Sequence, residues 1–308
     1  MVFTHTPYDG SKQPFTVGLE PVSEDAWLEP DEHLCAHLAR KAELLETVPQ
    51  VVFRAEPDTL SAQAETLALV VEHLKAHHTK RYDVTMDGMP QPKECDLAGR
   101  SGKDPDLMRA ASLIQEDLVL MRPGDNGYRI AAACLCFPSS WSLAEKFGQS
   151  MHDIHEGVPD FNTGRMGKVV GRIFENLQVG QLVGRYNWSI YDDPDLHHPQ
   201  AKQLVPQIEG ADANLLARLF VRVERQTLRR LAGSGDILFT IKIHHDPLAA
   251  LERDARGANL AQGLCGQLLA LDAEQLAYKG LSEHRDRLAA SLMQIAQAQG
   301  EESAAASN

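Results

Sequence analysis

Two hairpin signals in the middle of the chain constrain its fold more than any other feature of the sequence. In EDLVLMRPGDNGYRIAAACLCFP, β-rich runs stand on either side of the turn residues PGDNG, a pattern typical of a β-hairpin. Two further β-rich runs are joined by AGSG, and LVGRYNWSIYD reads as one more strand. Together these runs predict strands over residues 117–122, 128–136, 182–192, 217–231 and 236–246.

Helices are predicted on both sides of this strand-rich part. DEHLCAHLARKAELLETVP and DTLSAQAETLALVVEHLKAHH keep leucines at helical spacing, and each begins at an aspartate that can cap a helix. We expect residues 1–30 and 80–104 to be irregular. Helices are predicted over residues 31–49, 58–78, 105–113, 163–178 and most of 248–297.

The order of these elements predicts the fold class. Two strands, several short helices and three further strands form the order of a PAS domain, in which helices and an antiparallel sheet enclose one ligand pocket. The 308 residues, 43% of them apolar, suffice for a sizeable core. We predict an α+β protein with a PAS-like antiparallel sheet, divided into an N-terminal helical segment 1–104, a PAS-like domain 105–250, C-terminal helices 251–298 and a disordered tail 299–308.

The charge balance excludes some classes of partner. Acidic residues outnumber basic ones by 43 to 30, and the formal net charge is −13. Such a chain is poorly suited to binding nucleic acid or an anionic membrane surface, because both carry negative charge. The N-terminus MVFTHTPYDGSKQPF has no apolar core of a signal peptide, and no run of about 18 apolar residues predicts a membrane-spanning helix. We expect no nucleic acid, no membrane and a cytoplasmic protein.

The cysteines fit a reducing setting. There are five, an odd number at scattered spacing, which argues against a disulfide framework. Cys134 and Cys136 alternate with apolar residues in RIAAACLCF and are predicted to be buried strand residues rather than metal ligands.

Two histidines three residues apart, His152 and His155, lie in MHDIHEGVPDF just before Gly157 and Pro159. Residues three apart share a helix face, so one histidine could hold a heme iron, or both could hold another metal. The structural alternative is a pair of partly exposed histidines. The adjacent pairs His197–His198 and His244–His245 point opposite ways in a strand and are interpreted as surface or loop contacts.

Two predicted strands carry polar residues in alternation. Arg185 and Asn187 share one face, with Trp188 on the other, and Arg222 and Glu224 share a face of a later strand. On a solvated face such charges form ion pairs of little energetic value. Facing a pocket, unpaired charges are costly and usually serve a function. Alternation alone leaves both possibilities open.

Five short motifs give the chain a family resemblance. They are the Phe-Pro-Ser segment before Trp141, Glu-Lys-x-Gly in AEKFG, Ile-His with Val-Pro in IHEGVP, Arg-x-Asn-Trp in RYNW, and Arg-x-Glu-Arg-Gln in RVERQ. In this order, over roughly residues 14–250, the chain resembles the heme-binding alpha subunit of heme-dependent oxidative N-demethylase, also called dimethylamine monooxygenase. The histidines in TIKIHHDPL and the Glu-Gly after His155 depart from the family pattern, which concerns the substrate pocket more than the heme site.

The resemblance implies an enzyme, a heme-dependent amine monooxygenase. It implies a heme in a PAS-like pocket and oxidation of a small secondary amine, such as dimethylamine, by dioxygen with electrons from NADPH. The products would be a primary amine and formaldehyde. The electrons would pass through partner subunits carrying FMN and an iron–sulfur cluster, which agrees with the absence of a Rossmann fingerprint and a ferredoxin-like cysteine cluster in this sequence.

The resemblance also assigns roles to residues. It makes His155 the expected heme ligand, with His152 in reserve. Arg222 would stabilise iron-bound dioxygen, and Glu224 would hold the substrate ammonium or relay a proton. Three residues would shape the pocket or anchor the heme propionates: Arg185, Asn187 and Trp188. The alternatives are a non-catalytic heme or small-molecule sensor on the same scaffold, and a heme-free PAS-like assembly subunit.

Overall fold

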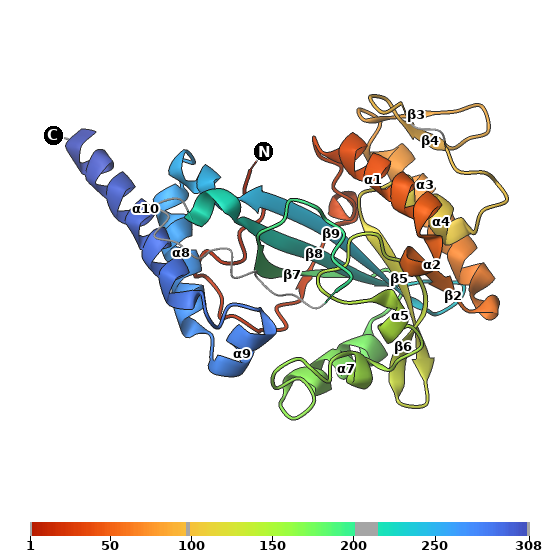
Figure 1. Cartoon of the computed structure of the whole chain (residues 1–308). Helices are drawn as coiled ribbons and strands as arrows, with labels where there is room; N and C mark the ends of the chain where they lie inside the picture. The colour runs from red at the N-terminus through yellow and green to blue at the C-terminus, as the bar shows by residue number, and fades with distance from the viewer. Residues whose placement is uncertain (1, 97–98, 201–214, 307–308) are drawn as a thin grey trace.

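The fold is built on one seven-stranded antiparallel sheet (Figure 1). The computed structural model describes residues 2–96, 99–200 and 215–306. The strands of the sheet, in spatial order, are β1 (Glu20–Pro21), β7 (Leu182–Tyr191), β8 (Phe220–Arg230), β9 (Ile237–Pro247), β5 (Asp117–Gly124), β6 (Gly127–Cys134) and β2 (Phe53–Ala55). The five strands predicted from the sequence are confirmed, as is the α+β class.

Helices surround the sheet in three groups (Figure 1). The N-terminal group holds η1 (Glu24–Ala26), α1 (Leu34–Thr47), α2 (Pro49–Val52), η2 (Pro57–Thr59), α3 (Leu60–His77) and α4 (Asp106–Ala111). The central group holds α5 (Leu143–Lys146), α6 (Met151–Ile154) and α7 (Met166–Asn176). The C-terminal group holds η4 (Leu215–Arg218), η5 (Leu248–Glu252), α8 (Gly257–Ala270), α9 (Ala273–Tyr278) and α10 (Arg285–Ala306).

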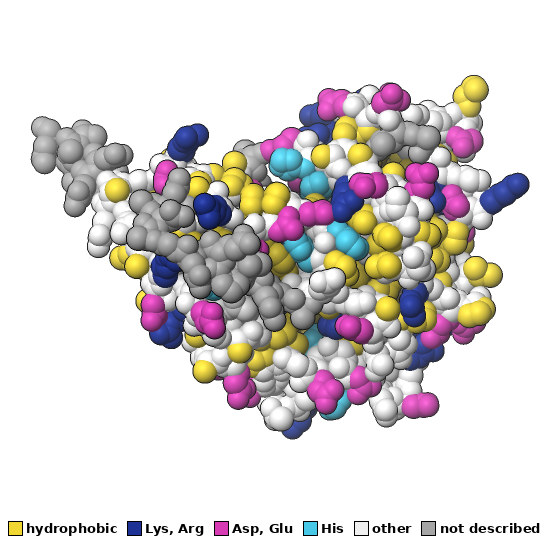
Figure 2. Space-filling model, in the orientation of Figure 1, with side chains coloured by type: hydrophobic (Ala, Val, Ile, Leu, Met, Phe, Trp, Pro, Cys, Tyr) yellow, Lys and Arg dark blue, Asp and Glu magenta, His cyan; other side chains and the backbone are white. Residues whose placement is uncertain are grey.

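Two apolar clusters hold the layers together. The larger lies where the N-terminal and central groups pack on β5, β6 and β9, and the smaller lies where α8 and α10 pack on the ends of β7 and β8. β8 and β9 pair over their whole lengths, from Phe220 opposite Pro247 to Arg230 opposite Ile237. This long twisted hairpin therefore connects the two clusters. Figure 2 shows histidines gathered near the middle of one face, among acidic and basic side chains.

Two parts of the chain expected to be irregular contain short strands. β3 (Tyr82–Val84) and β4 (Pro90–Pro92) form a separate hairpin, and β1 pairs with β7. Strands of two or three residues, one of them bounded by prolines, leave no periodic signal to detect. At the other end, α10 continues to Ala306, past residue 299 where we expected order to end. Residues 307–308 lie outside the described residues.

The expectation about cysteines needs correction. Cys35 on α1 and Cys95, which follows β4, form a disulfide across 60 residues of sequence. The β3–β4 segment folds back beside α1, a proximity that cysteine spacing does not reveal. Cys134 and Cys136 are buried and free, as predicted. Among the described residues, none of the helices combines the length and apolarity that crossing a membrane requires.

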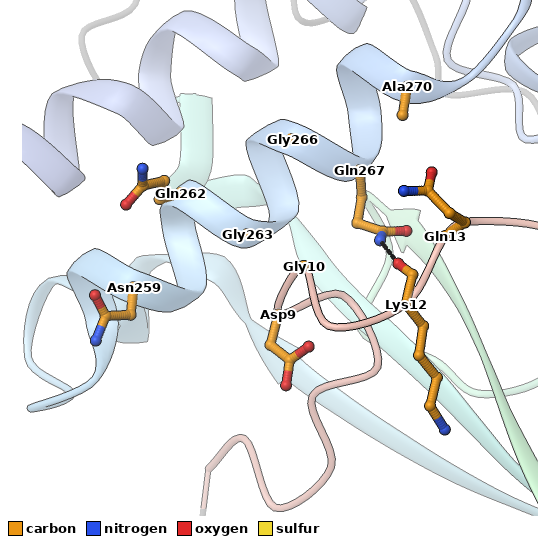
Figure 3. A pocket seen from close by; sticks show the side chains of 10 residues that line it. All are labelled: Asp9, Gly10, Lys12, Gln13, Asn259, Gln262, Gly263, Gly266, Gln267 and Ala270. Atoms are coloured by element: carbon orange, nitrogen blue, oxygen red, sulfur yellow. Dashed lines mark hydrogen bonds between the residues drawn. The ribbon is translucent and has the colours of Figure 1, made fainter.

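The N-terminal segment, residues 3–19, docks on α8. Phe3 and Tyr8 are fully buried, and the Phe3 amide donates to Asp246 Oδ2 at 3.1 Å. Figure 3 shows the close approach of this segment to Gly263, where a Cβ would lie 2.5 Å from the Asp9 carbonyl carbon. Gln267 on the same helix donates to the Lys12 carbonyl. The hollow between the two is about 550 Å³ in volume and is lined mostly by small and amide residues.

Stability should fall as the pH is lowered from 7 to 5, because burial lowers the pKa of several histidines. Burial lowers the pKa of His37 to about 4 and that of His73, His244 and His245 to about 3, from 6.5. The unfolded chain then binds protons that the folded chain excludes, so stability present above pH 6.5 is lost on the way down to the folded pKa. Each such proton is worth about 1.4 kcal/mol per pH unit.

Asp246 and Asp117 act in the opposite direction, because burial raises the pKa of both carboxyl groups, that of Asp246 to about 6, but the histidines with a lowered pKa outnumber them. Urea denaturation at pH 7 and pH 5 measures the difference in free energy of unfolding. The His73 ring packs edge-on against Trp27. In His73→Leu, the loss of unfolding free energy between pH 7 and pH 5 should be smaller than in the parent by the contribution of one histidine. Equal losses in the parent and in this variant would contradict the assignment.

Candidate functional site

The inner face of the sheet and the central helices enclose a cavity of about 720 Å³. Residues 4–19 of the N-terminal segment and the end of α9 form its remaining walls. One end is apolar, with side chains from both the sheet and the helices: Val119, Met121, Ile130, Leu228, Phe239, Ile154, Val158, Phe161, Val170 and Phe174. The volume lies in the range that proteins use for cofactors and drug-sized ligands.

His155 presents an imidazole to this cavity. It follows α6, whose first turn is capped by Ser150, and its Nδ1 lies 2.8 Å from the Met151 carbonyl oxygen. The ring stacks on Phe161 with centroids 4.0 Å apart and planes 10° apart. Burial lowers the pKa of His155 to about 4, so the ring is neutral at pH 7. With Nδ1–H donating to the carbonyl, Nε2 keeps its lone pair, the state that an axial metal ligand requires.

The second histidine of the pair lies outside the cavity. The His152 side chain is 67% exposed, and its Nδ1 lies 3.4 Å from Asp153 Oδ1. It is absent from the cavity wall. His152 lies within α6, which ends at Ile154. His155 is the residue after the helix, where the backbone is no longer helical, so the two side chains do not share a helix face. The structure thus separates a cavity histidine from a surface histidine.

A buried carboxylate lies on the sheet side of the cavity. Glu224 is 8% exposed, and its Oε2 accepts from Gln226 Nε2 at 2.8 Å and Asn187 Nδ2 at 3.4 Å. Glu224 is directly opposite Asn187 in the register of β7 and β8. All three side chains line the cavity. The alternation that left the inward face undecided is resolved, because Arg185, Asn187, Glu224 and Gln226 share the inner face.

Three cationic side chains accompany this carboxylate. Arg185, Lys146 and Lys279 line the cavity, and burial lowers the pKa of each, for Lys279 to about 8, while the charge of Glu224 raises it. Lys279 Nζ donates to the Trp188 carbonyl at 2.5 Å and lies 4.6 Å from the centre of its ring. Arg185 Nε is buried without a hydrogen-bond partner in the described parts of the chain. The polar end therefore holds more positive than negative charge and suits an anionic ligand.

Sequence reasoning did not select two of these cations. Lys146 belongs to the Glu-Lys-x-Gly motif, so the motif could have indicated that this lysine lies at the site. Lys279 follows α9, outside the range 105–250 that we assigned to the pocket-bearing domain. It reaches the cavity only because the C-terminal helices pack on the end of β7.

Arg222, like His152, is a predicted site residue that the structure does not bring into the cavity wall. It is fully buried, one alternate position beyond Glu224, where residues 137–139 cross the end of β8. Its Nε donates to Ser139 Oγ at 2.9 Å, and its Nη2 donates to the carbonyls of Phe137 at 2.9 Å and Leu196 at 3.1 Å. Its Nη1 finds no hydrogen-bond partner among the described residues.

The position of Arg222 suggests an indirect contribution to the cavity. The guanidinium carbon lies 5.1 Å from the centre of the Tyr191 ring, and both Tyr191 and Ser139 line the cavity. Arg222 therefore holds two wall residues from behind. Trp188, the remaining predicted residue, alternates to the other face of β7 but also borders the cavity, where its carbonyl and its ring contact Lys279.

The chain also matches a known protein family. The chain matches the family described as "Haem-dependent oxidative N-demethylase, alpha subunit-like" over residues 18–289, most of its length. That range includes all the cavity residues named above except those of the N-terminal segment before residue 18. The name of the family indicates heme dependence and an oxidative demethylation carried out with partner subunits. This chain belongs to the heme-dependent oxidative N-demethylase alpha subunit-like family.

Proposed function

We propose that the chain binds one heme in this cavity, with His155 as its axial ligand, and oxidatively demethylates a small secondary amine such as dimethylamine. The observation that carries the proposal is the neutral imidazole of His155, which lines the cavity, is fixed through Nδ1, and has no hydrogen-bond partner for Nε2 among the described residues. In histidines that ligate metals, a hydrogen bond donated by the other ring nitrogen fixes the tautomer.

The residues present fit a heme. The apolar end of the cavity suits the porphyrin, and the ring of Phe161 supports the imidazole. Arg185, Lys146 and Lys279 suit the two propionates, and the unpartnered Nε of Arg185 offers a donor that a carboxylate would satisfy. A PAS-like scaffold accords with the antiparallel sheet and the central helices around one pocket.

When bound, heme supplies the activation of dioxygen that oxidation of an N-methyl group needs. The chain's own residues deal with the amine. A small aliphatic amine is protonated near pH 7, and the Glu224 carboxylate can hold its ammonium by a charge-assisted hydrogen bond. Asn187 and Gln226 orient that carboxylate by donating hydrogen bonds to its Oε2. The same carboxylate can accept the proton that the ammonium must lose before its N-methyl group is oxidised.

Electrons would come from elsewhere. We propose that partner subunits carrying FMN and an iron–sulfur cluster deliver them from NADPH. The alpha subunit in the family's description and the absence of nucleotide and ferredoxin motifs in this sequence support that arrangement.

Glu224→Gln tests the proposal, because it removes the charge and keeps the shape. The assay uses heme-loaded protein supplied with a chemical reductant and dioxygen, and it measures formaldehyde formed from dimethylamine. The kcat/KM of the variant should be lower than that of the parent by a factor of at least about 100. Its Soret band should match that of the parent. Glu145→Gln, at an exposed carboxylate on α5 that does not belong to the cavity wall, is the matched control and should retain activity.

Other outcomes would favour the other functions. Stoichiometric heme binding with no formaldehyde from any small amine would overturn the enzyme and support a heme sensor. A parent protein that is colourless when purified and does not bind added heme would instead support the function of an assembly subunit.

A further inference from the structure

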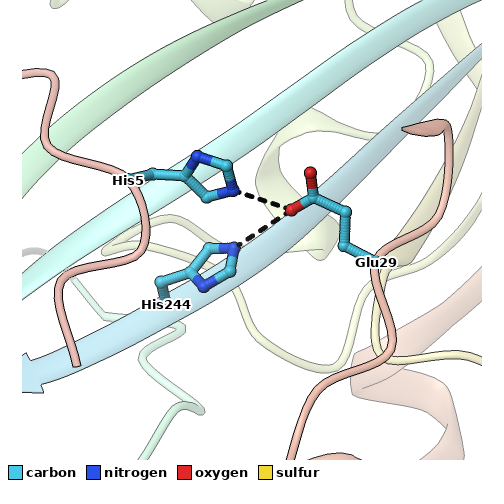
Figure 4. Close-up of side chains that lie close together, drawn as sticks. All are labelled: His5, Glu29 and His244. Carbon is cyan, nitrogen blue, oxygen red and sulfur yellow. Dashed lines mark hydrogen bonds and ion pairs between the residues drawn. The ribbon is translucent and has the colours of Figure 1, made fainter. Parts of the chain in front are cut away.

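Three potential metal ligands meet beside β9 (Figure 4). His5 comes from the N-terminal segment, Glu29 from the loop before α1, and His244 from β9. His5 Nε2 lies 2.7 Å from Glu29 Oε2, and His244 Nε2 lies 3.8 Å from the same oxygen. His244 is on the outer face because it pairs with Val223, the neighbour of the inward-facing Glu224.

The distances suit one ion after small side-chain movements. The ligand atoms of all three residues lie within 4.8 Å of one another. Two imidazole nitrogens and one carboxylate oxygen form a ligand set that Zn²⁺ uses, with bonds of about 2.0–2.2 Å, which places tetrahedral ligands roughly 3.4 Å apart. The gap between His5 and Glu29 must widen by about half an ångström or somewhat more, and the gaps to His244 must narrow, the one between the two imidazole nitrogens by up to about 1.4 Å.

His244 gives a second and independent indication of a ligand. Its side chain is 9% exposed, and its buried Nε2 has no hydrogen-bond partner within the described ranges. A buried polar atom without a partner costs free energy, which a bound ion would recover. Burial lowers the pKa of His244 to about 3, so the nitrogen carries a lone pair at pH 7.

Neighbouring side chains keep the Glu29 carboxylate ionised and oriented. Burial raises the pKa of Glu29, but the hydrogen bond with His5 and the charge of Arg225 outweigh burial and leave the pKa lowered. Arg225 Nε lies 3.0 Å from Glu29 Oε1, so it orients the carboxylate and leaves Oε2 towards the imidazoles. Outer partners of this kind hold the ligands of many metal sites in place.

Charge and access also permit a cation. The two nearby cations, Arg225 and Lys242, are offset by Glu29 and by Asp31, which lies 2.8 Å from Lys242. His5 is 19% exposed and Glu29 is 27% exposed, so solvent and ions reach the cluster. The balance predicts binding weaker than in a site with two carboxylates, since the surroundings contribute no net negative charge.

We propose that His5, Glu29 and His244 bind a divalent transition-metal ion of the Zn²⁺ class, with a further position open to water. The ion would tie the N-terminal segment to β9. His5 also belongs to the wall of the large cavity, so the ion would fix one side of that wall. The inference concerns the outer face of the sheet and stands whether or not heme binds at His155.

Zn²⁺ binding to the full chain tests the proposal. Protein treated with a chelator is dialysed against Zn²⁺ at graded concentrations, and bound zinc is measured by mass spectrometry. We expect one high-affinity ion per chain, and a loss of at least about 10-fold in affinity for His244→Gln and for His5→Gln. His5→Gln changes a residue near the N-terminus and serves if His244→Gln does not fold.

His77→Gln is the matched control. His77 is exposed at the end of α3 beside His73, a place where zinc could bind weakly, and its loss should leave the high-affinity ion unchanged. Zn²⁺ should also slow hydrogen exchange of the amides of residues 4–12 in the parent but not in His244→Gln. The proposal is overturned if the parent binds no zinc at micromolar concentrations, or if His5→Gln and His244→Gln bind it as the parent does.

Discussion

His155→Ala should abolish stable heme binding, with loss of the Soret band, while the far-ultraviolet circular dichroism remains that of the parent. The variant removes the neutral imidazole that faces the cavity and leaves the apolar wall and the cations in place. Changing a residue that hydrogen-bonds to a metal ligand typically lowers metal affinity by roughly 10–100-fold. We expect a larger loss of heme affinity here, because the ligand itself is removed. Nothing else among the described cavity residues offers an imidazole in its place except His5, which lies on the N-terminal segment.

Heme titration followed by visible absorption measures the effect. His152→Ala is the matched control, because that histidine is 67% exposed, and it should bind heme as the parent does. Added imidazole should restore a Soret band in His155→Ala by entering the vacated space. Heme retained with parental affinity in His155→Ala would show that another residue ligates the iron, and the same loss in His152→Ala would refute the separation of the two histidines.

Lys41→Met should destabilise the protein by about 3–5 kcal/mol, because it leaves a buried charge without its partner. Lys41 on α1 is fully buried, and its Nζ lies 3.6 Å from Asp117 Oδ1. It also donates to the carbonyls of Ala111 at 3.2 Å and Ile114 at 3.1 Å. The methionine would fill the space but satisfy none of these acceptors.

The free energy of unfolding, from urea denaturation, measures this loss. Lys93→Met is the control, since Lys93 is 38% exposed beside an exposed Asp83, and it should change stability by less than about 1 kcal/mol. Lys41→Met combined with Asp117→Asn should cost less than the sum of the two single changes, since the carboxylate is then also removed. A loss under about 1 kcal/mol for Lys41→Met would contradict the role given to the pair.

The buried pair also bears on the cavity. Asp117 accepts from the amides of Cys136 at 3.0 Å and Phe137 at 2.7 Å, and this segment continues to Ser139 in the cavity wall. Arg222 holds the same segment through Phe137 and Ser139. Two charged side chains behind the wall thus fix where its loop runs.

Much of the architecture could be predicted from local patterns. The turn residues PGDNG and AGSG lie between runs of strand-forming residues, and both hairpins form where they were predicted. Cys134 and Cys136 are buried because they alternate within such a run. Local signals suffice here because hairpin strands pair with their neighbours in sequence.

Contacts between distant segments were beyond such patterns. The Cys35–Cys95 disulfide depends on how residues 80–96 fold over α1. The cavity cation Lys279 depends on the packing of the C-terminal helices. Arg222 shares a face with Glu224, as its position in the strand predicted, yet a crossing loop covers it and excludes it from the cavity wall.

The sequence by itself therefore determined the strands, the principal helices, the α+β class and which residues share a face, because each follows from the chemistry of neighbouring residues. Only the tertiary structure decided which face lies inward, which of His152 and His155 meets the cavity, and that His5, Glu29 and His244 come together. These facts depend on packing between segments far apart in the chain, and the periodicity of one segment carries no information about its distant neighbours.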